Sequence, residues 1–276
     1  MSAVLTIAAK EIRDGFRHRW VIAATLLMAA LALTLALLGS APTGTVRLSS
    51  LSVTVVSLSS LTIFLVPLIA LLISYDAIVG EIERGTMGLM LSYPLSRWQV
   101  IAGKFLGHGT ILLIATVVGY GAAGLALALA GATPESGAWS AFVAMVGSSV
   151  LLGLVFVALG YLASAIVRDA RSAAGIAIGL WLLFALIFDM ALLGLLIADQ
   201  GRHVTVGLLN GLFLLNPADI YRLLNLTGFA NVSLLAGMAG VSEQITLARS
   251  ALVAALVAWT VLPLAAAAAI FTRKEV

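Results

Sequence analysis

Long stretches without a charged side chain are the feature that most restricts how this chain can fold. Residues 20–46, 48–75, 105–134, 136–167 and 250–272 carry no Lys, Arg, Asp or Glu, and residues 172–198 carry only Asp189. A helix that crosses a bilayer needs about 20 apolar residues. These runs therefore predict six transmembrane helices, centred in roughly 20–39, 53–74, 106–130, 140–166, 173–197 and 250–271.

The composition agrees with an all-α membrane protein that forms a single transmembrane domain over residues 1–276. The chain is 62% hydrophobic and 10% charged. Soluble domains carry about 25% charged residues, and disordered chains are still more polar. We therefore exclude a soluble enzyme and a disordered protein.

Positive charge is divided unequally between the two sides of the predicted bundle. Six spans place both termini on one side, and that side holds 11 of the 15 Lys and Arg residues. The other side holds Arg47, Arg202, Arg222 and Arg249. Because cytoplasmic loops are enriched in Lys and Arg, both termini are expected in the cytoplasm. No basic stripe with interleaved aromatics is present, so nucleic acid is not an expected partner.

The first 19 residues predict an amphipathic helix ahead of the first span. Leu5, Ala8, Ile12 and Phe16 recur at spacings of three and four, which places them on one helical face. Lys10 is expected to pair with Asp14 one turn later on the same helix. Such a helix lies along the cytoplasmic surface of the lipid bilayer; the alternative is a solvated, charged leader.

Residues 75–104, between the second and third predicted spans, form a long and charged cytoplasmic segment. Gly80, Gly85 and Gly88 divide it into short pieces, and Ser96 is placed to cap a helix after Pro94. About 30 residues is more than a connecting turn needs. We expect short helices across the cytoplasmic face, and the alternative is an ordinary solvated loop.

Residues 199–249, between the last two predicted spans, are too long for a hairpin and too polar for simple spans. They predict a pair of half-inserted or interfacial helices on the periplasmic side, joined by a polar, turn-rich junction at residues 216–222. The competing interpretation is two further full spans.

Asp189 is the one ionisable residue well inside a predicted span, and its role is either functional or structural. The sequence shows no charged partner for it at similar depth.

No pattern for catalysis, nucleotide binding or metal binding is found in the sequence. Gly103-Lys104 is followed by Phe105 and lacks the upstream glycine of a phosphate-binding loop. The chain has no cysteine, and its seven methionines and three histidines do not form a ligand set. We therefore expect no catalytic residues, no metal site and no cofactor bound by this chain.

Three short motifs resemble those of ABC-2-type transporter permeases. They are Glu-x-Glu-x-Gly-Thr at residues 81–86, Pro-Leu-Ser-Arg at 94–97, and Gly-Lys at 103–104. The six spans, the amphipathic N-terminal helix and the long segment before the last span are similar to that family as well. Over its full length, the chain resembles the permeases that serve maturation of bacterial nitrous oxide reductase.

The resemblance implies an inner-membrane homodimer that works with a cytoplasmic ATPase, where ATP and Mg²⁺ are bound. It also implies a coupling helix that docks on this ATPase and contains Glu81, Glu83, Arg84, Gly85 and Thr86. A periplasmic partner would be contacted by Asp219, Tyr221 and Arg222, although Asp219 and Arg222 could instead simply pair with each other.

The implied activity is export of a sulfur species, mechanical action on the periplasmic partner, or both, for assembly of the copper–sulfur centre of nitrous oxide reductase. One alternative is an ABC-2 exporter of a drug, a lipid or an ion. An alternative of another class is a membrane scaffold that transports nothing and has no ATPase.

Overall fold

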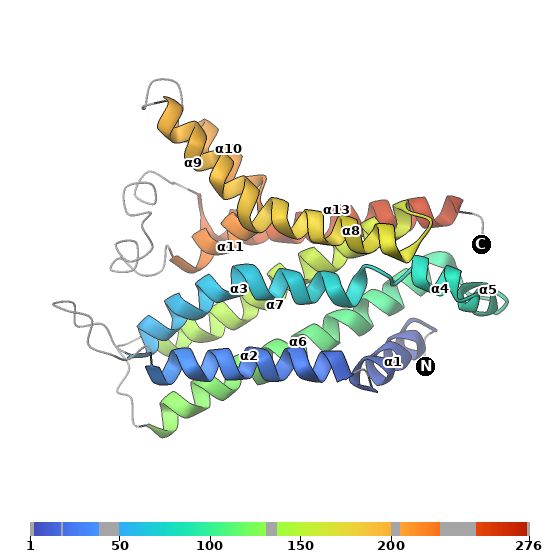
Figure 1. Ribbon diagram of the computed structural model, residues 1–276, viewed down its shortest axis with the longest axis horizontal. Helices are drawn as coiled ribbons and strands as arrows, with labels where there is room; N and C mark the ends of the chain where they lie inside the picture. The colour runs from blue at the N-terminus through green and yellow to red at the C-terminus, as the bar shows by residue number, and fades with distance from the viewer. Residues whose placement is uncertain are drawn as a thin grey trace.

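The fold is a bundle of long helices that run roughly side by side (Figure 1). The computed structural model describes residues 3–17, 19–38, 50–130, 137–199, 205–226 and 247–274. Their elements are α1 (Ala3–Arg17), α2 (Arg19–Leu38), α3 (Ser50–Ser74), α4 (Val79–Glu83), α5 (Thr86–Leu91), α6 (Arg97–Leu129), α7 (Ala138–Ile166), α8 (Ala170–Leu182), η1 (Leu183–Ile187), α9 (Phe188–Asp199), α10 (Val206–Leu214), α11 (Pro217–Leu226) and α13 (Arg249–Arg273).

The six predicted membrane spans are confirmed. Among the described residues, six helical stretches are long and apolar enough to cross a bilayer, and they coincide with α2, α3, α6, α7, the run from α8 to α9, and α13. The third span begins earlier than expected, because α6 already starts at Arg97. Ser96 and Gln99 form a capping box there, so the predicted cap at Ser96 is correct.

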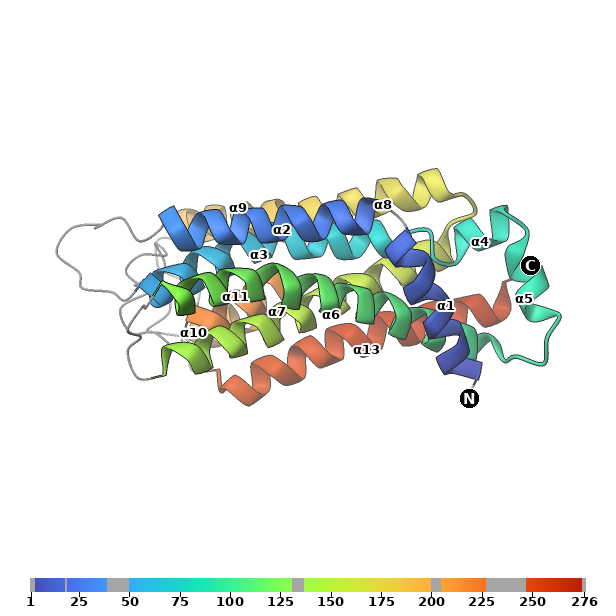
Figure 2. The ribbon, with the colours of Figure 1, turned by 90° about the horizontal axis from the view of Figure 1, so that it is seen from below.

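The core of the bundle is formed around α6 and α7. Helix α7 packs against α3 on one side and against α13 on another, while α2 packs along α6 (Figure 2). The buried residues at these contacts include large side chains such as Met28, Tyr120, Phe156 and Tyr161. Because these side chains come from several spans, they hold the long helices together at many levels of the bundle.

Helix α1 lies across α6 at the end of the bundle that also carries the C-terminus, here called the terminal end (Figures 1 and 2). A Cβ atom at Gly103 would lie 2.7 Å from the Cβ of Ile7, and one at Gly107 would lie 2.5 Å from the Cβ of Glu11. Both distances are shorter than a real carbon contact. Helix α1 therefore packs on α6 at the Gly103-x-x-x-Gly107 pair, where the backbones of α1 and α6 approach closely.

The fifth span is interrupted by a π-helical turn, η1, between α8 and α9. Beyond this turn α9 leans away from the bundle (Figure 1) and has no buried residue. On α8, Cβ atoms at Gly175 and Gly179 would meet open space. The fifth span is therefore held much less tightly within the chain than the other spans.

Within its described residues, the segment after the fifth span forms two short helices, α10 with 9 residues and α11 with 10, both too short to be full spans. The predicted turn-rich junction at residues 216–222 is wrong in extent, because most of it belongs to α11. Asn216 accepts a hydrogen bond from the backbone N–H of Ala218 at 2.9 Å, and Pro217 occupies the first helical position, where proline is favoured. Residues 200–204 and 227–246, which include most of the second predicted interfacial helix, lie outside the described residues.

Candidate coupling site

Two short helices, α4 and α5, cap the terminal end of the bundle. Gly85 lies between them with φ of 71°, a left-handed conformation that glycine adopts at little cost. The chain can therefore pass from α4 into α5 through only two residues. The expectation of short helices in residues 75–104 is confirmed, and the alternative of a simple solvated loop is wrong.

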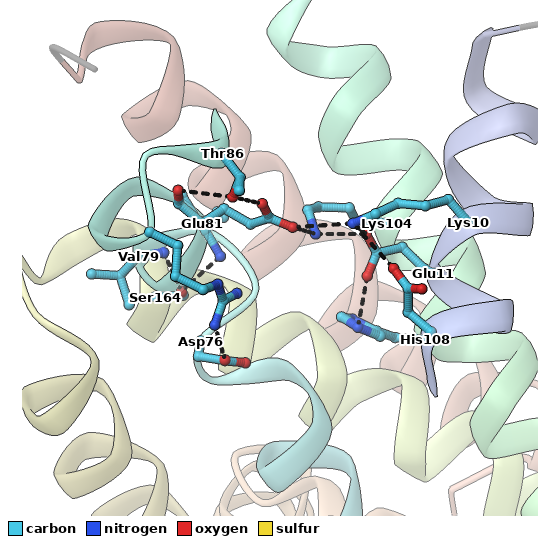
Figure 3. Close-up of polar contacts among 12 residues, drawn as sticks. Lys10, Glu11, Asp76, Val79, Glu81, Thr86, Lys104, His108 and Ser164 are labelled. Carbon is cyan, nitrogen blue, oxygen red and sulfur yellow. Dashed lines mark hydrogen bonds and ion pairs between the residues drawn. The ribbon is translucent and has the colours of Figure 1, made fainter. Parts of the chain in front are cut away.

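Helix α4 is held by side chains and backbone groups from two other helices. The hydroxyl of Ser164 on α7 accepts hydrogen bonds from the backbone N–H groups of Ile78 and Val79, both at 3.0 Å (Figure 3). Glu83 accepts one at 3.0 Å from the backbone N–H of Ala170, which opens α8. Since the first backbone N–H groups of a helix have no partner within it, these contacts fix the starts of α4 and α8.

A buried group of charged side chains lies between α1, α4 and α6. We call Lys10, Glu11, Glu81 and Lys104 the ion cluster (Figure 3). The Nζ atom of Lys104 lies 2.8 Å from Oε1 of Glu11 and 3.0 Å from Oε1 of Glu81, and its side chain is 3% exposed. The side chain of Lys10 is 49% exposed, and its Nζ atom lies 3.1 Å from Oε1 of Glu11 and 3.3 Å from Oε1 of Glu81.

The ion cluster is balanced, with two ammonium groups for two carboxylates. Burial opposes ionisation of Glu11, but hydrogen bonds and charge from His108 and Lys104 outweigh it and lower the pKa of Glu11. Burial also opposes the charge of Lys10, yet the two carboxylates raise its pKa. The charged forms of Glu11 and Lys10 are therefore favoured by their partners in the ion cluster.

Further polar contacts extend from the ion cluster to Thr86 on α5 and, through His108, to Tyr161 on α7. Thr86 on α5 donates a hydrogen bond to the carboxylate of Glu81. His108 on α6 lies 3.5 Å from Oε2 of Glu11 through Nε2, and its Nδ1 lies 2.8 Å from the hydroxyl of Tyr161 on α7. One connected set of polar contacts thus joins α1, α4, α5, α6 and α7.

A cavity of about 660 Å³ opens beside the ion cluster, between α1, α3, α4 and α6. Its polar lining includes Lys10, Glu11, Tyr75, Asp76, Lys104 and His108. Across the described part of the chain, no three acidic or histidine side chains gather as a set of metal ligands. The arrangement is suited to transmitting force and holding charge, and the expected absence of a metal or cofactor stays a prediction.

The five residues of the predicted coupling helix occupy two different environments. Glu81 is buried in the ion cluster, whereas Glu83, Arg84, Gly85 and Thr86 are exposed. Arg84 lies 3.5 Å from the carboxylate of Asp76. The burial of Glu81 could not be expected from its position in a charged segment, because its partners are far away in sequence.

The residues singled out near the far end of the bundle come together in space. Arg222 on α11 lies 2.7 Å from Asp219 and 2.7 Å from Asp189 on α9. The expectation that Asp189 has no charged partner is wrong, while the pairing of Asp219 with Arg222 is confirmed. Asp219 and Tyr221 are buried within the chain, and Arg222 is partly exposed. Their contact with a periplasmic partner stays a prediction.

Comparison with known proteins gives full-length similarity. The family described as ABC-2 family transporter protein matches residues 5–276. The "Probable ABC transporter permease protein NosY" of Pseudomonas aeruginosa is 48% identical over 277 residues, covering 100% of both chains. A protein of the same description from Stutzerimonas stutzeri is 47% identical over 276 residues, covering 99% of both chains.

Proposed function

Because the chain belongs to the ABC-2 family and is an ABC transporter permease subunit, we propose that α4 and α5 form the surface on which its ATPase docks. The ATPase binds ATP and Mg²⁺, and this chain binds neither. Both termini and the terminal end of the bundle face the cytoplasm of a bacterial cell, as the distribution of Lys and Arg favours.

The docking surface combines apolar and charged side chains. Leu89 on α5 is 68% exposed, and Tyr93 directly after α5 is 65% exposed. Both lie at the terminal end, beyond the long apolar part of the bundle, where lipid tails do not cover them. Glu83 and Arg84 are exposed nearby. Protein interfaces use such apolar anchors with a polar rim.

The observation that best supports a coupling role is that α4 is linked by hydrogen bonds or ion pairs to α6, α7 and α8, and through Lys104 to α1. Glu81 joins it to α6 through Lys104, and Lys104 is shared with Glu11 on α1. Glu83 joins it to α8, and Ser164 joins it to α7. A rigid displacement of α4 by the ATPase is therefore passed to α1 and to three spans at once. Coupling between distant sites requires an element to which both sites are linked, and α4 is linked to each of these helices by direct contacts.

The named relatives support a role in nitrous oxide reductase maturation. We propose a NosF-like ATPase as the cytoplasmic partner and a NosD-like protein as the periplasmic partner. The output is export of a sulfur species, mechanical action on the periplasmic partner, or both, during assembly of the copper–sulfur centre.

We further propose that two copies of the chain form a homodimer through the fifth span. This span is little buried within one chain, and the Gly175-x-x-x-Gly179 face of α8 meets open space. Pairs of small residues at this spacing let membrane helices approach closely. Replacing both glycines by leucine is expected to convert the purified dimer into a monomer in detergent.

The docking surface is tested with purified permease and ATPase reconstituted in lipid nanodiscs. Replacing Leu89 and Tyr93 by alanine should abolish co-purification and reduce permease-stimulated ATP hydrolysis at least about tenfold, because central apolar anchors contribute about 2 kcal/mol or more each. Leu125→Ala is the matched control, since Leu125 is similarly exposed but lies far along α6. Equal effects of the control and the double replacement would contradict the proposed surface.

The proposed client is tested in cells. The chain is deleted, nitrous oxide reductase is purified from the periplasm, and its copper and acid-labile sulfide are measured. An exported, folded enzyme without the copper–sulfur centre supports the maturation role. A complete centre would overturn it and leave an ABC-2 permease with another cargo, such as a drug, a lipid or an ion.

A further inference from the structure

Three charged side chains meet where α9 touches α11, and we call them the triad: Asp189, Asp219 and Arg222. The guanidinium of Arg222 donates from Nη1 to Oδ1 of Asp219 and from Nη2 to Oδ2 of Asp189, both at 2.7 Å. Asp219 is 1% exposed, and its second oxygen accepts a hydrogen bond from Nδ2 of Asn216 at 3.0 Å. The triad is thus a built, hydrogen-bonded site at the far end of the bundle from the ion cluster.

The triad differs from the ion cluster in its charge balance. It has two carboxylates for one guanidinium, so its net charge is −1 if all three groups are ionised. The described helices that pack against α11 are α3, α7, α10, η1 and α13, and their only charged residues are Arg249 and Arg273 at the two ends of α13. Their titratable neighbour groups are otherwise limited to tyrosine, such as Tyr161 on α7 and Tyr221 on α11 itself. A buried, uncompensated charge is costly, and one bound proton removes it.

The environment of Asp219 agrees with this balance. Burial raises the pKa of Asp219 to about 7, against the opposing charge of Arg222, and the charge of Asp189 adds to the rise. Asp189 is more accessible than Asp219, with side-chain exposures of 31% and 1%. The bound proton is therefore placed on Asp219, the buried carboxyl group of the triad.

The attachment of α9 to α11 is suited to opening. The π-helical turn η1 directly precedes α9, and its Phe184 carbonyl accepts a hydrogen bond from Nδ2 of Asn216 at 3.1 Å. This contact fixes the turn next to the start of α11. Beyond it, α9 has no buried residue and leans away from the bundle (Figure 1), and Asp189 is the second residue past the turn. A π-helical turn is a frequent site of bending, so α9 can move about η1.

We propose that the triad is a proton-binding site whose single proton is bound while α9 is docked on α11 and is released when α9 moves away. In the docked state Asp219 carries the proton beside Arg222, and the net charge of the triad rises from −1 to zero. When Asp189 leaves with α9, Arg222 is left to Asp219 alone, and the Asp219 proton passes to water. The remaining Asp219–Arg222 pair is again neutral, and the departing Asp189 is hydrated.

The sign of the pH dependence follows from this scheme. The pKa of Asp219 is higher in the docked state than in the undocked state, so docking is favoured at low pH and is lost as the pH rises toward the docked value. With that value at about 7, the docked-to-undocked ratio falls about 50-fold between pH 5 and pH 7 and changes little above pH 8.

The bound proton is tested directly by infrared titration of the full chain in lipid nanodiscs. The expected result is the carbonyl band of a protonated, buried carboxylic acid at pH 5, lost with a midpoint near pH 7 and absent in Asp219→Asn. Asp189→Asn should remove the band at pH 6, because Arg222 then serves Asp219 alone. A wild-type chain without the band at pH 5, or a band unchanged in both variants, would overturn the proposal.

The coupling to α9 is tested by distance measurement between two spin labels. The chain has no cysteine, so Ile197→Cys on α9 and Val253→Cys on α13 carry the only labels. The expected result is a short distance at pH 5 that gives way to a longer one by pH 8, and a short distance at both values in Asp219→Asn. The same distance distribution at pH 5 and pH 8 in the otherwise unchanged chain would overturn the link between proton and movement.

Discussion

Replacing Lys104 by methionine is the sharpest test of the ion cluster. The substitution keeps the length and the apolar stem of the side chain but removes the ammonium group that lies 2.8 Å from Glu11 and 3.0 Å from Glu81. Two buried carboxylates then share only Lys10, which is half exposed. Removing one partner from a buried ion pair costs about 3–5 kcal/mol. At about 1.4 kcal/mol per factor of ten, the docked population of α1 and α4 should fall at least ~100-fold relative to the open one.

The assay is amide hydrogen exchange of the purified permease in nanodiscs, followed separately for peptides of α1, α4 and α13. Exchange in α1 and α4 should become at least ~100-fold faster in Lys104→Met, while α13 stays unchanged because it does not contact the cluster. Lys10→Met is the matched control. Its ammonium group contacts the same two carboxylates but is 49% exposed, so its loss should cost less than about 1 kcal/mol.

A second variant separates loss of an ion pair from loss of packing. Neutralising all three buried groups together, as Lys104→Met with Glu11→Gln and Glu81→Gln, leaves no buried charge, since the remaining Lys10 is half exposed and lies 3.5 Å from Asp14. This triple replacement should restore most of the protection. The reasoning is refuted if Lys104→Met exchanges at the wild-type rate, if Lys10→Met has an equal effect, or if the triple replacement opens α1 further.

Three further predictions concern the same end of the bundle. Gly107→Leu should detach α1, because a Cβ atom there would lie 2.5 Å from the Cβ of Glu11. Gly121→Leu should leave α1 in place, because a Cβ atom there meets open space. A crosslink between one cysteine on α1 and one on α6 distinguishes the two variants. Because the folded pKa of Glu11 lies below its ordinary value of 4.5, its contribution to stability is complete above that value and is lost as the pH falls below it, so the melting temperature in detergent should drop on acidification less steeply in Glu11→Gln. Ser164→Ala leaves two buried N–H groups at the start of α4 without their acceptor and should destabilise its docking by about 1–3 kcal/mol, measured as faster exchange in α4 alone.

The sequence predicted those parts of the fold that depend on local pattern. Uncharged runs located all six spans, because charge is excluded from a lipid-facing helix wherever it lies. Ser96 was recognised as a cap, since capping is decided within four residues. Lys10 and Asp14 were expected to pair and lie 3.5 Å apart, because they are one turn apart on the same helix.

What the sequence could not predict are contacts between distant helices. The sequence places Lys104 at the end of the charged segment 75–104, and its partner Glu11 is 93 positions away. The sequence shows no charged partner for Asp189, because Arg222, 33 positions later, belongs to a helix that the sequence presents as a turn-rich junction. In both cases the oppositely charged partner is brought close only by the tertiary fold, and no spacing within one helix predicts the pair.

The seating of α1 on α6 also constrains how the protein is made. Helix α1 emerges from the ribosome before α6, and Gly103, Gly107 and Lys104, on which it rests, follow about 93 residues later. At a synthesis rate of about 5–20 residues per second, α1 waits roughly 5–20 s before its seat exists. During this interval the face of α1 that carries Ile7 and Glu11 lacks the helix that later covers it, so α1 joins the folded structure only after α6 has been made.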